Sequence, residues 1–194
     1  MHGGALVGVI VGAICLVLVL ILAWFLTTYN KLVRQRNQVQ ASWAQIDVQL
    51  KRRADLIPNL VETVKGYAAH ERGTLDAVVA ARNNAVTAAA NNAPAAARAE
   101  AENAVTATLG RLFALAEAYP NLKANENFLS LQSELGGTED KIAYARQFYN
   151  TAVQTFNTSV QTVPTNMVAG MTGFRAQTLF EVAGADRGPV QVRF

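Results

Sequence analysis

The sequence predicts an all-α protein in which an N-terminal transmembrane helix is followed by an antiparallel bundle of long helices. Residues 5–26 carry no charge, and two later segments place apolar residues at alternating steps of three and four, the spacing of one helix face. Turns rich in proline or asparagine separate the helical segments. We expect an anchor over residues 1–28, a helical-bundle domain over 29–180 and an irregular tail over 181–194.

The uncharged segment has 22 residues and would form a helix about 33 Å long. A bilayer's hydrocarbon core is about 30 Å thick, so slight tilt accommodates one crossing. A cleaved signal peptide would need basic residues before a shorter apolar run and a small-residue cleavage site after it. The leader here is only Met1-His2-Gly3-Gly4, and the run ends in Trp24-Phe25-Leu26. We therefore expect a retained single-pass anchor in the cell membrane.

The anchor carries two kinds of candidate interaction residue. Small residues every four positions let two membrane helices approach closely, although glycine is also common in membrane helices generally. Aromatic and basic residues at the end of the anchor suit the headgroup layer. The small residues are Gly4, Gly8 and Gly12; the interface residues are Trp24, Tyr29, Lys31, Arg34 and Arg36.

Charge gives a weak indication of orientation and excludes some partners. Net charge is +3, too small to indicate nucleic-acid binding. Residues 29–90 hold nine Lys or Arg against five Asp or Glu, so the basic excess lies beside the membrane. Basic residues follow the anchor and none precedes it, which favours a cytoplasmic bundle.

Residues 29–90 show a helical repeat with one conflict. The stripe comprises Trp43, Ile46, Leu50, Ile57, Leu60, Val64, Tyr67 and Val78. Pro58 removes a backbone donor inside this pattern, so we expect a kink or a restart there, with Asp55 helping to cap it.

Two further helices are expected. The first begins at Pro94 after an asparagine turn and ends near residue 118, before Tyr119-Pro120. The second runs over about 123–163, with an interruption at Gly136-Gly137 and a fresh N-cap at Thr138. Whether that interruption breaks the helix or only bends it is left open by the sequence. One short helix is expected within 166–180.

The basic run Arg52-Arg53 with Asp55 has two interpretations. Arg53 falls on the apolar stripe, so its stem could pack in the bundle while its head meets Glu139 or Asp140. Alternatively, these residues form a docking patch for a partner.

No catalytic or cofactor-binding constellation stands out. His70-Glu71 begins like a zinc-protease helix, but Thr74 occupies the position of the second ligand. The single cysteine, Cys15, lies in the anchor, and Ile14 before it is unlike a lipoprotein cleavage site. Two histidines and one cysteine supply too few ligands for zinc. We therefore predict no enzyme activity, no metal and no cofactor.

Long strings in this chain resemble the LemA family of bacterial single-pass membrane proteins. They are YNKLVRQRNQVQASWAQIDVQLKRRADLIPNLVETVKGYAAHE at 29–71, YPNLKANENFLSLQSEL at 119–135, TEDKIAYARQFYN at 138–150 and VPTNMVAGMTGF at 163–174. The chain departs from the family pattern at Gly136-Gly137 and in the tail. The resemblance implies an anchor followed by a bundle, and it carries over no catalytic residue. Lipoprotein-type relatives imply that some family domains lie outside the cytoplasm.

Two functions are open at this point. The first is a structural scaffold that binds the lipid bilayer, forms a homo-oligomer and organises or remodels membrane. The second is an accessory or sensor subunit that presents a helical face to a membrane protease or kinase.

Overall fold

The structure is a computed structural model that describes residues 2–180, with side chains from Val7 onward. It confirms the all-α prediction: the described residues contain helices and no strand. The helices are α1 (His2–Lys65), α2 (Arg72–Ala90), α3 (Ala95–Ala116), α4 (Pro120–Lys123), α5 (Glu126–Gln161) and α6 (Thr165–Thr172). The tail predicted over 181–194 lies outside the described residues.

The chain divides into two compact units. Unit 1 takes the part of α1 up to Ala41 together with Thr151–Gln177, and unit 2 takes Ser42–Asn150 with the segment that begins at Thr178. Helices α1 and α5 therefore each contribute residues to both units. The boundary predicted at residue 28 lies inside unit 1.

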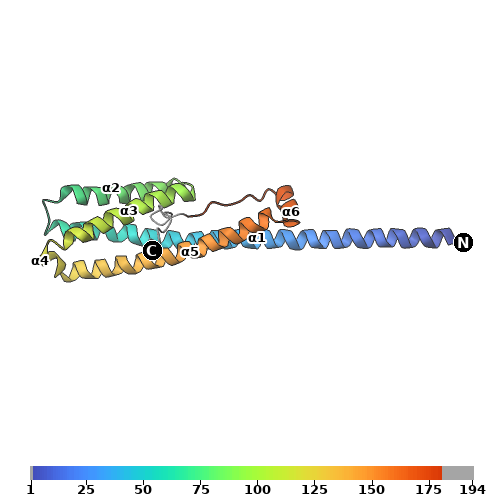
Figure 1. Cartoon of the computed structure of the whole chain (residues 1–194), viewed down its shortest axis with the longest axis horizontal. Helices are drawn as coiled ribbons and strands as arrows, with labels where there is room; N and C mark the ends of the chain where they lie inside the picture. Colours follow the sequence, from blue (N-terminus) through green and yellow to red (C-terminus); the bar gives the residue numbers. More distant parts are fainter. Residues whose placement is uncertain (1, 181–194) are drawn as a thin grey trace, which may run out of the picture. The chain divides into compact units, whose positions relative to one another are not determined.

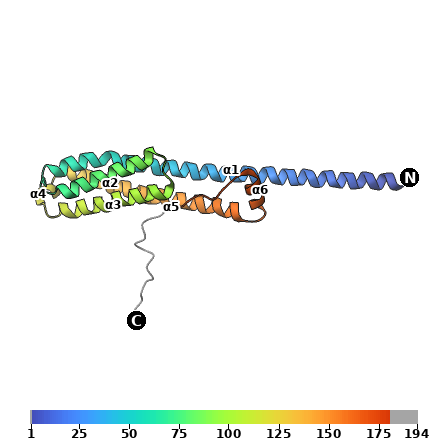
Figure 2. The same ribbon diagram turned by 90° about the horizontal axis from the view of Figure 1, so that it is seen from above.

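Unit 2 is a bundle of antiparallel helices. The C-terminal part of α1 lies beside α2, α3 and the first part of α5, and α4 connects α3 to α5 at one end (Figures 1 and 2). Apolar stripes with helical spacing meet in the centre, where burial of each large side chain contributes about 1.5–3 kcal/mol. The buried core includes Ile57, Leu60, Val64, Leu75, Val78, Leu109, Leu112, Leu122, Phe128 and Leu135.

The expected restart at Pro58 is wrong, because α1 continues without interruption to Lys65. Proline removes the N–H that would donate to the carbonyl four residues earlier, which is that of Ala54. The Nε of Arg82 on α2 donates a hydrogen bond of 2.8 Å to this carbonyl. A neighbouring helix thus satisfies the acceptor that Pro58 leaves open. Asp55 is exposed and lies within the helix, so it caps nothing.

We expect Arg82→Gln to lower the free energy of unfolding by about 1 kcal/mol, the usual net value of one intramolecular hydrogen bond. In a Pro58→Ala background the restored N–H can donate to Ala54, so the same change should cost clearly less. A double-mutant cycle monitored by thermal unfolding measures this coupling. Equal costs in both backgrounds would show that Arg82 does not compensate for Pro58.

The helical segment is interrupted instead at residues 66–71, which form the loop between α1 and α2. Gly66 follows the last helical residue of α1, a common stop signal. The Tyr119 hydroxyl donates to a Glu71 carboxylate oxygen at 3.0 Å, and Asn125 Nδ2 donates to the Tyr67 hydroxyl at 3.0 Å. The hydrogen bond with Glu71 is the main cause of a raised Tyr119 pKa. This end of the bundle is therefore held together by polar contacts between loops.

The expected N-cap at Thr138 is also wrong. Helix α5 runs through Gly136-Gly137 without a break. The Thr138 hydroxyl donates to the Glu134 carbonyl at 2.7 Å, the bond of a threonine in a helix interior. Thr138 is buried, so packing against the bundle offsets the low helix propensity of the two glycines.

Unit 1 packs α6 and the last turns of α5 against α1. Its buried residues include Leu32, Val39, Val153, Phe156 and Val168. Helix α6 is the short helix expected within 166–180, and it ends at Gly173, whose φ of 76° favours glycine. The ring of the next residue, Phe174, lies 5.8 Å from Tyr29 and 6.2 Å from Phe156, measured between ring centroids.

Candidate functional site

The first candidate site is the apolar segment of α1. Helix α1 contains an 18-residue window with a mean hydropathy of 3.2, none of which is buried. Between residues 7 and 27, every side chain is exposed except that of Phe25, which is half-buried. Burial of α1 begins at Thr28. By length and composition, this helix can cross a membrane once.

The predicted small-residue face is open where it is described. A Cβ added at Gly8 or Gly12 would meet nothing within 4 Å. Gly4 lies outside the residues whose surroundings the structure describes. Packing against the residues that the structure describes therefore does not explain the glycines at positions 8 and 12.

The predicted interface residues surround the point where burial begins. Trp24 is 39% exposed and Tyr29 is 37% exposed. Lys31, Arg34 and Arg36 are also exposed. In addition, the Arg36 guanidinium lies 5.2 Å from the centroid of the Phe174 ring, so this cation also takes part in packing unit 1.

The second candidate site is an ionic cluster in unit 2. We define it as Asp47, Arg53, Arg98, Glu102, Glu139 and Arg146. It holds three cationic and three anionic residues, and it connects the parts of α1, α3 and α5 that lie in unit 2. Opposite charges therefore balance within it.

Arg53 is the centre of this cluster. Its side chain is only 2% exposed, and its two terminal nitrogens form ion pairs with Glu102 and Glu139. Nη1 also donates to the Thr106 hydroxyl at 2.8 Å, and Nη2 donates to the Glu102 carbonyl at 3.1 Å. Such a network satisfies a guanidinium that has been removed from water.

The other two arginines extend the cluster. Arg98 Nη2 lies 2.6 Å from an Asp47 carboxylate oxygen, and Arg146 Nη2 donates to Asn103 Oδ1 at 3.2 Å. Burial lowers the pKa of Arg146, and the charge of Arg53 lowers it further, whereas the charges of Glu139 and Glu102 raise it. The two carboxylates thus partly offset the cost of burying a second cation beside Arg53.

An aromatic cluster, defined as Trp43, Tyr149 and Phe180, adjoins these arginines. The Trp43 ring lies 5.1 Å from Tyr149 and 5.5 Å from Phe180 between centroids. The Arg98 guanidinium lies 5.0 Å from the Trp43 centroid, and that of Arg146 lies 4.6 Å from the Phe180 centroid. Burial raises the pKa of Tyr149, whose hydroxyl donates to the Thr178 carbonyl at 2.9 Å. Cation–π contacts therefore link the two clusters.

Asn150 fixes the backbone of Phe180. Its Nδ2 donates to the Phe180 carbonyl at 3.1 Å, and its Oδ1 accepts from the Phe180 N–H at 2.9 Å. Asn157 holds Gln177 in unit 1 by the same pair of bonds, at 2.9 and 2.8 Å. An asparagine side chain has one donor group and one acceptor, so it can satisfy both backbone groups of an extended residue.

Of the run that the sequence singled out, only Arg53 enters the ionic cluster. Arg52 is exposed and lies 3.5 Å from a Glu134 carboxylate oxygen. Asp55 and Asp140 are exposed as well. Arg53 therefore faces the interior of unit 2, whereas its neighbours in the predicted patch face solvent.

Sequence analysis missed Arg98, Glu102 and Phe180, and it also missed Asp47 and Arg146 of the ionic cluster. The sequence pattern does point to Arg98 and Glu102, because both lie on the same helix face as the apolar stripe that begins at Val105. Charged residues on the apolar stripes of two helices can indicate a buried pair between them. Phe180 follows a helix end and lies in no periodic pattern, so no such signal points to it.

A third feature is an open groove between α1 and α5 in unit 2. It has a volume of about 480 Å³ and is lined by Gln45, Val48, Gln49, Asp140, Lys141, Tyr144 and Ala145. Val48 is 63% exposed and Tyr144 is 73% exposed. The groove therefore presents apolar surface between polar flanks.

A protein-family model described as the LemA family matches residues 42–194. The chain belongs to the LemA family. The match begins at the residue where unit 2 begins along α1. The ionic and aromatic clusters of this LemA-family chain therefore lie within the matched region.

Three curated relatives are similar along most of this LemA-family chain. Magnetosome protein MamQ 2 of Paramagnetospirillum magneticum is 26% identical over 191 residues, covering 87% of this chain and 70% of the relative. Magnetosome protein MamQ of Magnetospirillum gryphiswaldense is 24% identical over 198 residues, covering 89% and 73%. Protein LemA of Metamycoplasma hominis is 25% identical over 158 residues, covering 81% and 71%.

Proposed function

We propose that this LemA-family chain is a non-enzymatic, membrane-anchored helical scaffold that self-assembles and organises or remodels membrane. The observation that carries the proposal is α1, one helix whose apolar side chains are exposed over residues 7–24 and which contributes buried residues to each unit from Thr28 onward. Exposed apolar surface of this length requires lipid or a partner to cover it. The magnetosome names of two relatives support a role at a membrane.

The buried polar groups of unit 2 support a structural role. Arg53 is neutralised by Glu102 and Glu139, and Arg98 by Asp47. Ion pairs buried between helices fix which faces meet, even where they add little net stability. The ionic cluster therefore suits a protein whose bundle must keep one arrangement while it binds other molecules.

Two described surfaces suit self-assembly. Gly8 and Gly12 leave one face of the apolar segment open to a second helix. In unit 2, the groove with Val48 and Tyr144 offers an apolar surface to a second copy of the chain. We propose a homo-oligomer formed first through the membrane segment, because small residues there permit close backbone contact.

We expect the full-length protein in mild detergent to be larger than a monomer, and Gly8→Leu to shift it toward the monomer. Leucine at this position would separate the two helix backbones by the width of a side chain. Light scattering coupled to size exclusion measures the change. Ile10→Leu is the matched control, since it alters an exposed residue on another face without adding bulk. A wild type that is monomeric and unchanged by Gly8→Leu would exclude assembly through the anchor.

Crosslinking in native membranes separates the scaffold from an accessory subunit. Contacts between copies of the chain support the scaffold, whereas one dominant foreign protein would favour an accessory or sensor subunit of a membrane protease or kinase. The cytoplasmic location of the bundle, based on Lys31, Arg34 and Arg36, stays a prediction.

A further inference from the structure

We infer that α6 is an interfacial helix that inserts its exposed methionines into the membrane surface, with basic residues of unit 1 binding anionic lipid headgroups. This inference needs the anchor to lie in lipid but does not depend on self-assembly. Its evidence comes entirely from unit 1.

Helix α6 has one face packed and one face uncovered. Val168 and Ala169 are each 1% exposed, whereas Met167 is 64% exposed and Met171 is 77% exposed. Methionines at i and i+4 share one side of a helix. Val163, just before the helix, is 72% exposed. The two methionines of α6 and the nearby Val163 are thus largely uncovered by the described residues of unit 1.

The position of α6 brings this face to the height of the headgroups. Of the segments of unit 1 that pack against α1, α6 lies nearest the N-terminal end of that helix in both ribbon views (Figures 1 and 2). Phe174, two residues after the end of α6, contacts Tyr29. Tyr29 is three residues, or about 4.5 Å of helix, beyond Leu26. The headgroup layer is about 5–7 Å deep on each side of a bilayer, so α6 adjoins that layer.

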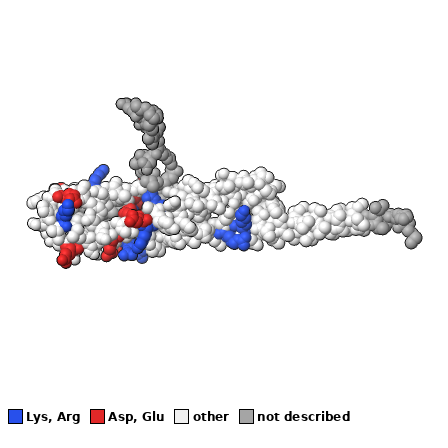
Figure 3. All heavy atoms as spheres, turned by 60° about the horizontal axis from the view of Figure 1, so that its bottom comes forward, with Lys and Arg blue, Asp and Glu red and all other residues white. Residues whose placement is uncertain are grey.

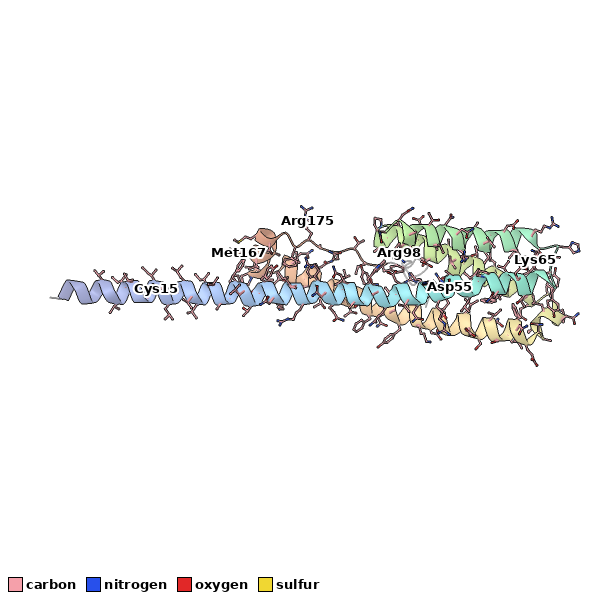
Figure 4. All side chains as sticks on the ribbon, turned by 180° about the vertical axis from the view of Figure 1, so that it is seen from behind. Cys15, Asp55, Lys65, Arg98, Met167 and Arg175 are labelled. Atoms are coloured by element: carbon pink, nitrogen blue, oxygen red, sulfur yellow. The ribbon has the colours of Figure 1, made fainter. Side chains whose placement is uncertain are left out.

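The charge of unit 1 suits an anionic surface. Its sequence contains four Lys or Arg and no Asp or Glu. All 14 acidic residues of the chain lie in the sequence of unit 2. The basic residues are Lys31, Arg34, Arg36 and Arg175. On the face that Figure 3 shows, the part of the surface nearer the N-terminal end carries basic atoms and no acidic ones. Figure 4 labels Met167 on α6 and shows Arg175 projecting from the segment that follows this helix. Basic residues near an anionic leaflet strengthen membrane binding by electrostatic attraction.

A lipid surface is therefore the occupant that fits this face. Interfacial helices bury an apolar face about 5–10 Å into the boundary between headgroups and acyl chains, and cationic residues beside them strengthen binding. The uncovered methionines lie on the helix that precedes Phe174, and Phe174 contacts Tyr29 just beyond the apolar segment. The basic residues beside it match phosphatidylglycerol or a similar anionic lipid.

Spin labels on the full-length protein in vesicles test the inference. In a Cys15→Ala background, Met167→Cys and Met171→Cys are made as separate variants, and each cysteine is labelled with a nitroxide. Val86→Cys, at an exposed position on α2, is the control variant. In vesicles that contain phosphatidylcholine and phosphatidylglycerol, we expect labels at 167 and 171 to collide with oxygen more than with a water-soluble nickel complex. The label at 86 should show the reverse. Equal preference for the nickel complex at all three sites would overturn the insertion of α6.

The basic residues are tested in the same vesicles. Arg175→Gln should make the label at 171 more accessible to the nickel complex, whereas Arg111→Gln, an exposed arginine of α3 in unit 2, should not. Removing phosphatidylglycerol should have the effect of Arg175→Gln. A depth that changes with neither lipid charge nor Arg175 would overturn the role of the headgroup contacts. These readouts are independent of whether the protein is monomeric in detergent.

Discussion

Arg53→Leu is expected to lower the free energy of unfolding of the bundle by about 3–5 kcal/mol, the cost of breaking a buried ion pair by removing one partner. The substitution leaves the carboxylates of Glu102 and Glu139 without their cation, and Glu102 is nearly inaccessible to water. Thermal or urea unfolding of the full-length protein in mild detergent, followed by circular dichroism, measures the effect.

Two variants separate this explanation from the loss of packing. Arg52→Leu, in the neighbouring exposed pair with Glu134, should change stability by less than about 1 kcal/mol. Replacing Arg53, Glu102 and Glu139 together by apolar residues should restore stability to about the wild-type value or above it. A melting temperature that holds or rises in Arg53→Leu, with assembly lost, would assign Arg53 to docking instead.

Phe180→Ala is expected to cost about 3–5 kcal/mol, the range for truncating a buried phenylalanine. Phe180 is 1% exposed and contacts both Trp43 and Arg146. The variant should therefore lower the melting temperature as strongly as a substitution in the centre of a helix. The loss of the Trp43 contact should also change the near-ultraviolet circular dichroism signal.

The support of Asn150 for Phe180 can be measured separately. Asn150→Ala removes two hydrogen bonds to the Phe180 backbone, so we expect a cost of about 1–3 kcal/mol. Gln154→Ala, at an exposed position on α5, is the comparison. If Asn150→Ala and Gln154→Ala lower the free energy of unfolding equally, the hydrogen bonds of Asn150 do not support Phe180.

Local patterns were sufficient for the long helical segments, but not for the short helix α4 or for the break between α1 and α2. The sequence predicts a kink or a restart at Pro58, yet α1 continues without a restart, and Arg82 from another helix satisfies the carbonyl that Pro58 leaves open. At Gly136-Gly137 the sequence leaves open whether the helix breaks or only bends, and the structure shows that α5 continues through both glycines. Contacts from other elements outweigh local propensity at such positions, and a single segment does not reveal them.

The sequence by itself determined the helical class, the apolar segment and the family, because 3.6-residue periodicity, an uncharged run and long matched strings are all local properties. The sequence also offered Glu139 as one of two candidate partners of Arg53. Only the tertiary structure decided that Arg53 meets both Glu139 and Glu102, that Phe180 belongs to a core and that α6 leaves Met167 and Met171 uncovered. The physical reason is that a buried charge or ring takes its stability from partners that are distant in sequence. Which partners these are is decided when the helices pack.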